Sequence, residues 1–131
     1  MYRIKVDNRI ALVEVELGGL MSVEEVARYI DDLRSALIRH RLRNYLFLLD
    51  ITTCPIQQQD MLRAMGQHMG TMPKARRIAV VTGSSLAGMQ VRRLFTQPYA
   101  RITANVADAR AWLIDGTEPP HGSHGQAAVI G

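Results

Sequence analysis

Apolar and polar residues alternate near the start of the chain, in the sequence Ala-Leu-Val-Glu-Val-Glu-Leu at residues 11–17. Alternation with a period of two is typical of a β-strand that buries one face. A second strand-like run occupies residues 2–6, and Asp7 and Asn8 between the two runs favour a tight turn. We therefore predict that the chain opens with an antiparallel hairpin, whose second strand covers residues 10–17.

The hydrophobic period then changes to that of an amphipathic helix. Ser22 is followed three residues later by Glu25, a capping-box pattern that begins helices. Apolar residues recur downstream at spacings of three, four and seven, namely Val23, Val26, Ile30, Leu33 and Leu37. The pattern predicts a long amphipathic helix that ends near Arg41.

Residues 44–51, NYLFLLDI, form a continuous apolar run that ends near Asp50. Such a run is typical of a strand covered on both faces, so we expect it at the centre of a sheet with parallel neighbours. Residues 78–82 predict another buried strand, and residues 99–104 predict a last short one.

Three further helices are predicted between and after these strands, over residues 57–70, 86–95 and 106–114. Ser84 or Ser85 is a candidate N-cap for the second of them, and Asn105 for the third, whose Ala109, Trp112 and Leu113 are expected to face inward. Strands that alternate with helices predict an α/β domain with a largely parallel sheet in two or three layers.

Length and composition set the domain organisation. The chain has 131 residues, of which 47% are hydrophobic and 21% are charged, as in ordinary globular proteins. We predict one domain over residues 1–115. Residues 116–131 are rich in Gly, Pro and His without periodicity, so we expect them to form a flexible tail.

The sequence also bears on location. Its apolar runs are shorter than the roughly 18 residues that span a bilayer, and its first ten residues lack the pattern of a signal peptide. The single cysteine, Cys54, has no intrachain partner for a disulfide. We expect a cytoplasmic protein.

The net charge is +4, with basic clusters at residues 39–43, at residues 74–77 and at Arg92 and Arg93. Only two Phe, one Trp and four Tyr are available to stack on bases, which argues against nucleic-acid binding. The basic clusters are still compatible with binding of an anionic ligand.

Residues 76–95, RRIAVVTGSSLAGMQVRRLF, contain the stretch most like a functional signature, a strand followed by a Gly/Ser turn and a helix. Gly83 and Gly88 have the spacing of the two glycines in a phosphate-binding loop. However, Met89 and Gln90 occupy the positions that require a lysine and a hydroxyl, so the sequence argues against this function. The partial match to the dinucleotide-binding turn of short-chain dehydrogenases fails as well, because it is confined to one turn.

The same turn partly matches a serine nucleophile motif. A hydrolase using Ser84 or Ser85 needs a histidine and a carboxylate, yet the histidines that follow are His121 and His124, both in the expected tail. Two histidines without a third ligand rarely form a specific metal site. We therefore predict no catalytic residue, metal or cofactor, and interpret the turn as architectural.

The order of elements resembles the STAS domain, and more closely its SpoIIAA-like branch of small stand-alone bacterial proteins. The resemblance rests on the opening hairpin, on LFLLDI as the central strand, on RRIAVVTGS as the next strand and turn, and on ADARAWL as the closing helix. It implies a four- or five-stranded sheet backed by helices on one face, frequent dimerisation, and a role in protein recognition or ligand sensing.

Phosphorylated members of that family carry an Asp-Ser-Ser/Thr-Gly turn after the central strand. This chain has TTCPIQQQD there, without a serine, so the resemblance does not carry over the phosphorylation switch, although Thr52 and Thr53 have hydroxyls.

Three functions are compatible with the sequence. We favour a non-enzymatic binding or regulatory module that recognises a protein or a second copy of itself. The alternative is a carrier or sensor of a small apolar or anionic ligand, held between the predicted helices at residues 57–70 and 86–95. The third function is a hydrolase using Ser84, Ser85 or Cys54. The candidate partner or ligand surface comprises Thr52, Thr53, Cys54, Gln58, Met61, Met65, Met69, Arg92 and Arg93.

Overall fold

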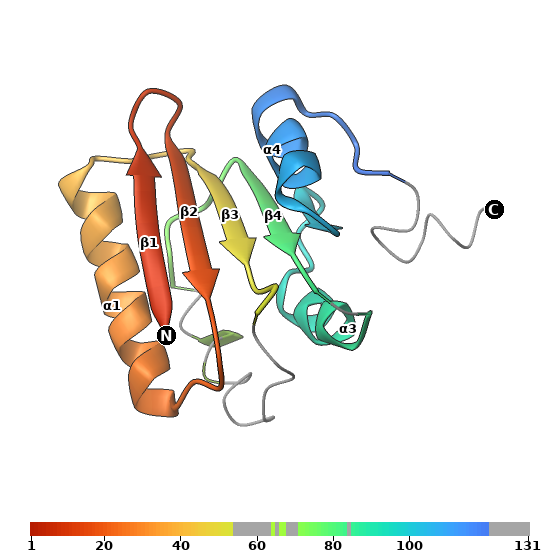
Figure 1. Ribbon diagram of the computed structural model, residues 1–131. Helices are drawn as coiled ribbons and strands as arrows, with labels where there is room; N and C mark the ends of the chain where they lie inside the picture. Colours follow the sequence, from red (N-terminus) through yellow and green to blue (C-terminus); the bar gives the residue numbers. More distant parts are fainter. Residues whose placement is uncertain (54–63, 65, 68–70, 84, 121–131) are drawn as a thin grey trace.

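The computed structural model describes residues 1–53, 64, 66–67, 71–83 and 85–120, with the backbone alone at 85–87. These residues form one five-stranded sheet and three helices (Figure 1). The strands are β1 (Tyr2–Asp7), β2 (Leu12–Leu17), β3 (Leu46–Asp50), β4 (Arg77–Val81) and β5 (Ala100–Thr103). The helices are α1 (Val23–Arg39), α3 (Ser85–Leu94) and α4 (Val106–Asp115).

The strands lie in the sheet in the same order as in the chain. β1 and β2 pair antiparallel, with Tyr2 opposite Leu17, and β2 to β5 pair parallel. This confirms the predicted α/β fold with an N-terminal hairpin, and it places the apolar strand β3 at the centre. Of the helix predicted over residues 57–70, the described Ala64, Gly66 and Gln67 have helical backbone, and the rest lies outside the described residues.

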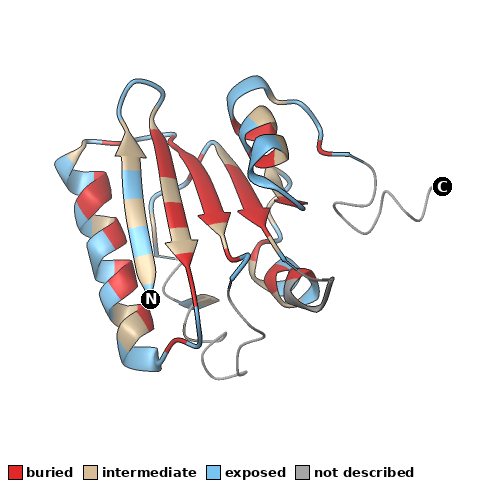
Figure 2. Ribbon diagram, in the orientation of Figure 1, coloured by how far each residue is buried: buried red, intermediate tan, exposed pale blue. Residues whose placement is uncertain are grey.

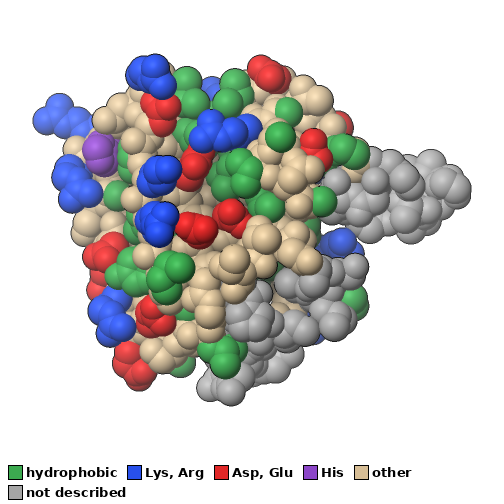
Figure 3. All heavy atoms as spheres, viewed as in Figure 1, with side chains coloured by type: hydrophobic (Ala, Val, Ile, Leu, Met, Phe, Trp, Pro, Cys, Tyr) green, Lys and Arg blue, Asp and Glu red, His purple; other side chains and the backbone are tan. Residues whose placement is uncertain are grey.

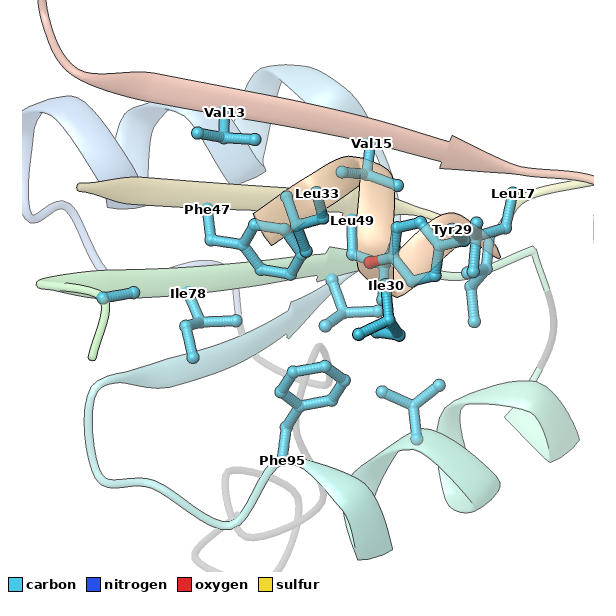
Figure 4. Packing of buried hydrophobic residues seen from close by; sticks show 14 of the residues in the cluster. Val13, Val15, Leu17, Tyr29, Ile30, Leu33, Phe47, Leu49, Ile78 and Phe95 are labelled. Atoms are coloured by element: carbon cyan, nitrogen blue, oxygen red, sulfur yellow. The ribbon is translucent and has the colours of Figure 1, made fainter. Parts of the chain in front are cut away.

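The two faces of the sheet carry separate apolar clusters, because side chains alternate along each strand. One face packs against α1 and α3, and its cluster includes Val13, Val15, Leu17, Tyr29, Ile30, Leu33, Phe47, Leu49, Ile78, Val80 and Phe95 (Figure 4). The other face packs against α4, through Leu12, Leu46, Leu48, Ala79, Val81, Ala109, Trp112 and Leu113. The central strands are accordingly buried on both sides (Figure 2).

The helices therefore do not lie on one face, which corrects what the family resemblance implied. The reason is that β3 and β4 are apolar on both faces, and the second face would expose its leucines and valines to water without a cover. Trp112 and Leu113 of α4 supply that cover.

Local signals set the ends of α1. The Ser22 hydroxyl oxygen accepts a hydrogen bond from the backbone N–H of Glu25 at 3.1 Å, which confirms the predicted N-cap. The Glu25 carboxylate pairs with the N-terminal amine of Met1 at 2.6 Å. At the other end, Arg41 adopts the left-handed conformation (φ 52°), and Leu42 N–H donates to the Leu37 carbonyl, which closes the helix.

The end of the domain is held by contacts that follow α4. Asn105 caps this helix as predicted, accepting a hydrogen bond from Asp108 N–H at 2.8 Å. Beyond the helix, the Glu118 carboxylate pairs with Arg101, with both N···O distances at 2.8 Å, and Pro119 is buried. The first residues of the expected tail thus contact the sheet, whereas residues 121–131 lie outside the described residues, so the boundary at residue 115 stays a prediction.

The part of the sheet that α4 leaves uncovered is charged. Arg3 of β1 faces Glu16 of β2 at 3.6 Å, and Glu14 of β2 pairs with Arg110 of α4. Figure 3 shows the resulting mixture of basic and acidic side chains over β1 and β2. None of the helices in the described part of the chain has the length and apolar character required to cross a bilayer.

Candidate functional site

Thr52 and Thr53, the first two residues of the predicted surface, lie just beyond the carboxyl end of β3, and both are exposed. The backbone N–H of Gly19, which follows β2, donates to the Thr53 carbonyl at 3.4 Å. Leu20 comes next in the chain, and its side chain is 66% exposed. The loops after β2 and β3 therefore form one continuous surface at the carboxyl edge of the sheet.

The turn after β4 joins this surface through a very close backbone approach. A Cβ atom placed on Gly83 would lie 2.7 Å from the Thr52 carbonyl oxygen, closer than real Cβ contacts allow. Ile51 N–H donates to the Val81 carbonyl at 2.9 Å and fixes the same two segments together. Gly83 thus permits the contact by lacking a side chain. Backbone freedom is not the reason for this glycine, because a positive φ is found only at Gly19 and Gly116 among the described glycines.

The one carboxylate at the end of β3 is engaged in this structure. Asp50 Oδ1 accepts hydrogen bonds from the backbone N–H of Thr52, at 2.9 Å, and from the Thr52 hydroxyl. Both bonds are local and fix the loop as it leaves the strand. Asp50 therefore orders the start of the candidate surface.

Most of the residues considered for catalysis and metal binding lie outside the described part of the chain. Ser84, Cys54, His121 and His124 are outside the described residues, and α3 begins at Ser85. Within the described ranges, no group of three His, Cys, Asp or Glu side chains is arranged to hold a metal ion.

The rest of the predicted surface divides into two parts. Arg92 and Arg93 are exposed in the last turn of α3, where positive charge interacts favourably with the helix dipole. This turn lies at the opposite end of α3 from Gly83 and Thr52. The other predicted residues lie outside the described residues, namely Cys54, Gln58, Met61, Met65 and Met69.

A second feature lies at the amino ends of β3, β4 and β5, beside the last turn of α3. It is a cavity of about 280 Å³, which we call the amino-edge cavity. Its walls carry four aromatic rings, and its polar side chains include an amine and an amide; the residues of interest are Tyr45, Phe47, Lys74, Phe95, Gln97 and Tyr99.

The polar groups of the amino-edge cavity differ in their partners. The Tyr45 hydroxyl donates to the Pro73 carbonyl at 2.7 Å, and burial raises the pKa of Tyr45 to about 12. Lys74 Nζ lies 5.3 Å from the centroid of the Tyr99 ring, within the range of a cation–π contact. Gln97 Oε1 is buried without a hydrogen-bond partner.

Apart from Lys74, which belongs to the basic cluster at residues 74–77, the residues of this cavity were not predicted from the sequence. A signal was present, because Tyr45 and Tyr99 each stand immediately before a parallel strand, and parallel strands begin at the same edge of a sheet. Gln97 gave no signal, since its burial depends on the path of the chain after α3.

Comparison with known proteins supports the fold. No family model matches the chain, and no curated protein matches it. Among solved structures, the chain is similar to the crystal structure of an uncharacterised protein of the DUF3478 family, with a SpoIIAA-like fold, from Shewanella loihica PV-4. The TM-score is 0.65 at 18% sequence identity, over 86% of this chain and 93% of the other. The chain therefore has a SpoIIAA-like fold, as its resemblance to that branch implied.

Proposed function

We propose that this protein is a non-enzymatic recognition module that binds another protein, or a second copy of itself, through the carboxyl-edge surface. This surface comprises Leu20, Thr52, Thr53 and Gly83. The observation that carries the proposal is the exposed Leu20 side chain on a loop whose backbone is fixed to the next loop.

Preorganisation is what makes this surface suitable for binding. The contacts of Gly19 with Thr53 and of Gly83 with Thr52 hold the loops before a partner arrives, so association loses less conformational entropy. Burial of Leu20 against a partner would contribute roughly 1.5–3 kcal/mol. We extend the proposed surface to the predicted residues that follow in the chain, Cys54, Gln58, Met61, Met65 and Met69.

Light scattering on the purified chain, combined with capture of partners from solution, tests the proposal. We expect Leu20→Asp to abolish association, because a carboxylate would be buried in the interface. Ile114→Asp is the matched control, since Ile114 is 42% exposed and lies on α4, outside the carboxyl-edge surface. A wild-type chain that stays monomeric at all concentrations and captures no partner would contradict the proposal.

The absence of enzymatic activity is part of the proposal. Its structural support is that Asp50, the carboxylate closest to the surface in sequence, already accepts two hydrogen bonds from Thr52. A hydrolase would instead react with a serine- or thiol-directed probe, and labelling would cease on substitution of Ser84, Ser85 or Cys54 by Ala. The expected cytoplasmic location stays a prediction.

A carrier of a small apolar or anionic ligand is the second candidate. The amino-edge cavity favours it, because the cavity lies between Gly66, in the predicted second helix, and Leu94 at the end of α3. Arg92 and Arg93 precede Leu94 and add positive charge to this end of the molecule.

A further inference from the structure

We infer that a groove at the carboxyl end of α1 is a second docking surface, and that it binds an acidic, partly apolar segment of another protein. The groove lies between this end of α1 and residues 71–73, has a volume of about 780 Å³, and is called the basic groove below. Its exposed and half-exposed residues are Arg34, Ile38, Arg41, Arg43, Thr71 and Pro73. Residues 41–43 lead into the start of β3, so the basic groove lies at the opposite edge of the sheet from the carboxyl-edge surface.

The fold brings together two basic clusters that are far apart in the sequence. The cluster at residues 39–43 leads into β3, the cluster at residues 74–77 leads into β4, and these two strands are parallel neighbours. Arg76 N–H donates to the Tyr45 carbonyl at 2.7 Å, which joins the two segments before the strands begin. Figure 3 shows basic side chains gathered around the histidine near the carboxyl end of α1. The exposed cations of the two clusters are Arg39, Arg41, Arg43, Lys74 and Arg76.

These five cations have no carboxylate partner among the described residues. The ion pairs in that part of the chain involve other basic groups, and only Arg34 of the basic groove is in one, with Asp31 at 3.7 Å. The carboxyl end of α1 carries about half a negative charge, which offsets a small part of the excess. This edge of the molecule therefore has a surplus of positive charge that attracts an anionic partner.

The side chains at this edge favour the carboxylates of a polypeptide. Four of the five cations are arginines, whose planar guanidinium groups form paired hydrogen bonds with carboxylates, and arginine clusters commonly recognise acidic segments. Single-stranded nucleic acid needs exposed rings on which its bases stack. Here Tyr45 and Phe47 are only 4% and 2% exposed, and Lys74 Nζ lies over the half-exposed Tyr99 ring. A bilayer is flat on this scale and would meet only the rim of the basic groove, whereas a polypeptide segment can enter it.

Ile38 supplies the apolar part of the surface. Its side chain is 71% exposed, the highest value among the large apolar side chains of the described residues. Pro73 is exposed on the facing wall of the basic groove. Leu37 and Leu42 are only 3% and 9% exposed, so they shape the groove without offering contact area. An apolar side chain of the partner between Ile38 and Pro73 would shield both from water.

The walls of the basic groove are fixed to each other by hydrogen bonds. The Arg34 guanidinium donates to the Thr71 hydroxyl oxygen at 2.8 Å, which joins α1 to the facing wall. The Tyr45 hydroxyl donates to the Pro73 carbonyl at 2.7 Å, which joins that wall to the start of β3. Walls that are ordered before association lose less conformational entropy when a partner binds.

Fluorescence anisotropy of the full chain with three matched peptides tests the surface. The reference peptide is Glu-Asp-Glu-Leu-Asp-Glu-Leu-Glu-Asp-Glu, labelled with fluorescein. In the second peptide Gln and Asn replace every Glu and Asp, and in the third Ser replaces both Leu. We expect the second not to bind, and the third to bind about 5- to 10-fold more weakly than the reference. An increase in sodium chloride from about 10 to about 150 mM should weaken binding of the reference peptide about 10-fold or more, because it shortens the Debye length from about 30 to about 8 Å.

Variants of the groove and a charge-matched control locate the binding. Arg41→Asn suits the left-handed backbone at this residue and, like Arg43→Gln, should weaken binding of the reference peptide about 3- to 5-fold. Ile38→Ser should remove the difference between the reference and the serine peptide. The control carries Lys5→Gln and Arg28→Gln, which remove two exposed charges outside the basic groove and should change the affinity less than about 2-fold. Circular dichroism checks that each variant is folded.

Three results would overturn the inference. One is a failure of the wild-type chain to bind the reference peptide at about 1 mM and low salt. Another is an equal loss of affinity in the control and in the chain with both Arg41→Asn and Arg43→Gln, which would mean that net charge alone attracts the peptide. The last is tighter binding of phosphatidylserine vesicles or single-stranded DNA than of the peptide, lost in the same variants. None of these results bears on association through Leu20, which light scattering measures separately.

Discussion

Gly83 and Gly88, the two glycines of the signature-like turn, should respond in opposite directions to substitution by alanine. In Gly83→Ala the new Cβ would lie 2.7 Å from the Thr52 carbonyl oxygen, an atom of the backbone that cannot rotate away. In Gly88→Ala the nearest atoms, Oγ1 of Thr82 and Cγ2 of Ile102, are at 3.6 and 3.9 Å, which is ordinary van der Waals contact.

The magnitudes follow from these contacts. At Gly83 the loops after β3 and β4 must separate by a few tenths of an ångström, against the Ile51–Val81 hydrogen bond that fixes them. Overpacking of this kind costs about 1–3 kcal/mol. At Gly88 the alanine fits, and replacing glycine inside a helix stabilises by about 1 kcal/mol. The two variants should therefore differ by about 2–4 kcal/mol in the free energy of unfolding.

Thermal unfolding followed by circular dichroism measures the difference. For a domain of this size, 1 kcal/mol corresponds to roughly 4 °C in Tm. We expect Gly83→Ala to lower the Tm by about 4–12 °C, and Gly88→Ala to raise it by about 4 °C. Inorganic phosphate and ATP should shift neither value, because a bound ligand would stabilise the folded chain.

The reasoning fails if Gly83→Ala melts at or above the wild-type temperature, or if Gly88→Ala melts below it. A rise in the wild-type Tm with added phosphate, lost in Gly83→Ala, would show instead that the turn binds an anion.

Three further predictions concern the packing of the domain. Trp112→Phe loses the indole N–H, which donates to two backbone carbonyls at 3.1 and 3.2 Å, so urea denaturation should show a loss of about 2–3 kcal/mol. Burial raises the pKa of the Tyr45 hydroxyl from 10.0 in the unfolded chain to about 12 in the folded one, so the unfolded chain loses the hydroxyl proton first as the pH rises. The contribution of Tyr45 to the free energy of unfolding should be full below pH 10.0 and decrease towards pH 12. Tyr45→Phe should therefore show a smaller decrease in urea midpoint over this pH range than the wild type. Glu118→Gln weakens the pair with Arg101, and the free energy of unfolding should decrease by about 1 kcal/mol at low salt and by less at high salt.

The candidate site could be predicted only in part. The sequence pointed to Thr52 and Thr53, because they follow the apolar strand β3 and so had to lie at the carboxyl edge. The predicted helix over residues 86–95 already put Arg92 and Arg93 at the far end of that helix from Gly83. The sequence did not show which edge of the sheet this end would reach, because that depends on the direction in which α3 runs along the sheet, a property of the assembled fold.

The sequence by itself determined the elements whose signals are local. The alternation in β2, the capping pair Ser22 and Glu25, and the unbroken apolar run of β3 each specify backbone conformation and burial within a few residues. These signals were enough to predict the mixed sheet, its opening hairpin and its central strand.

Only the tertiary structure decided which segments distant in the chain come into contact. It placed α4 on the face opposite α1 and α3, brought Gly83 against the Thr52 carbonyl, and buried Gln97 Oε1 beside a cavity. Periodicity reports whether a side chain is buried, but not which partner buries it. Partners are selected by the packing of the whole chain, in which shape and hydrogen bonding must be satisfied together.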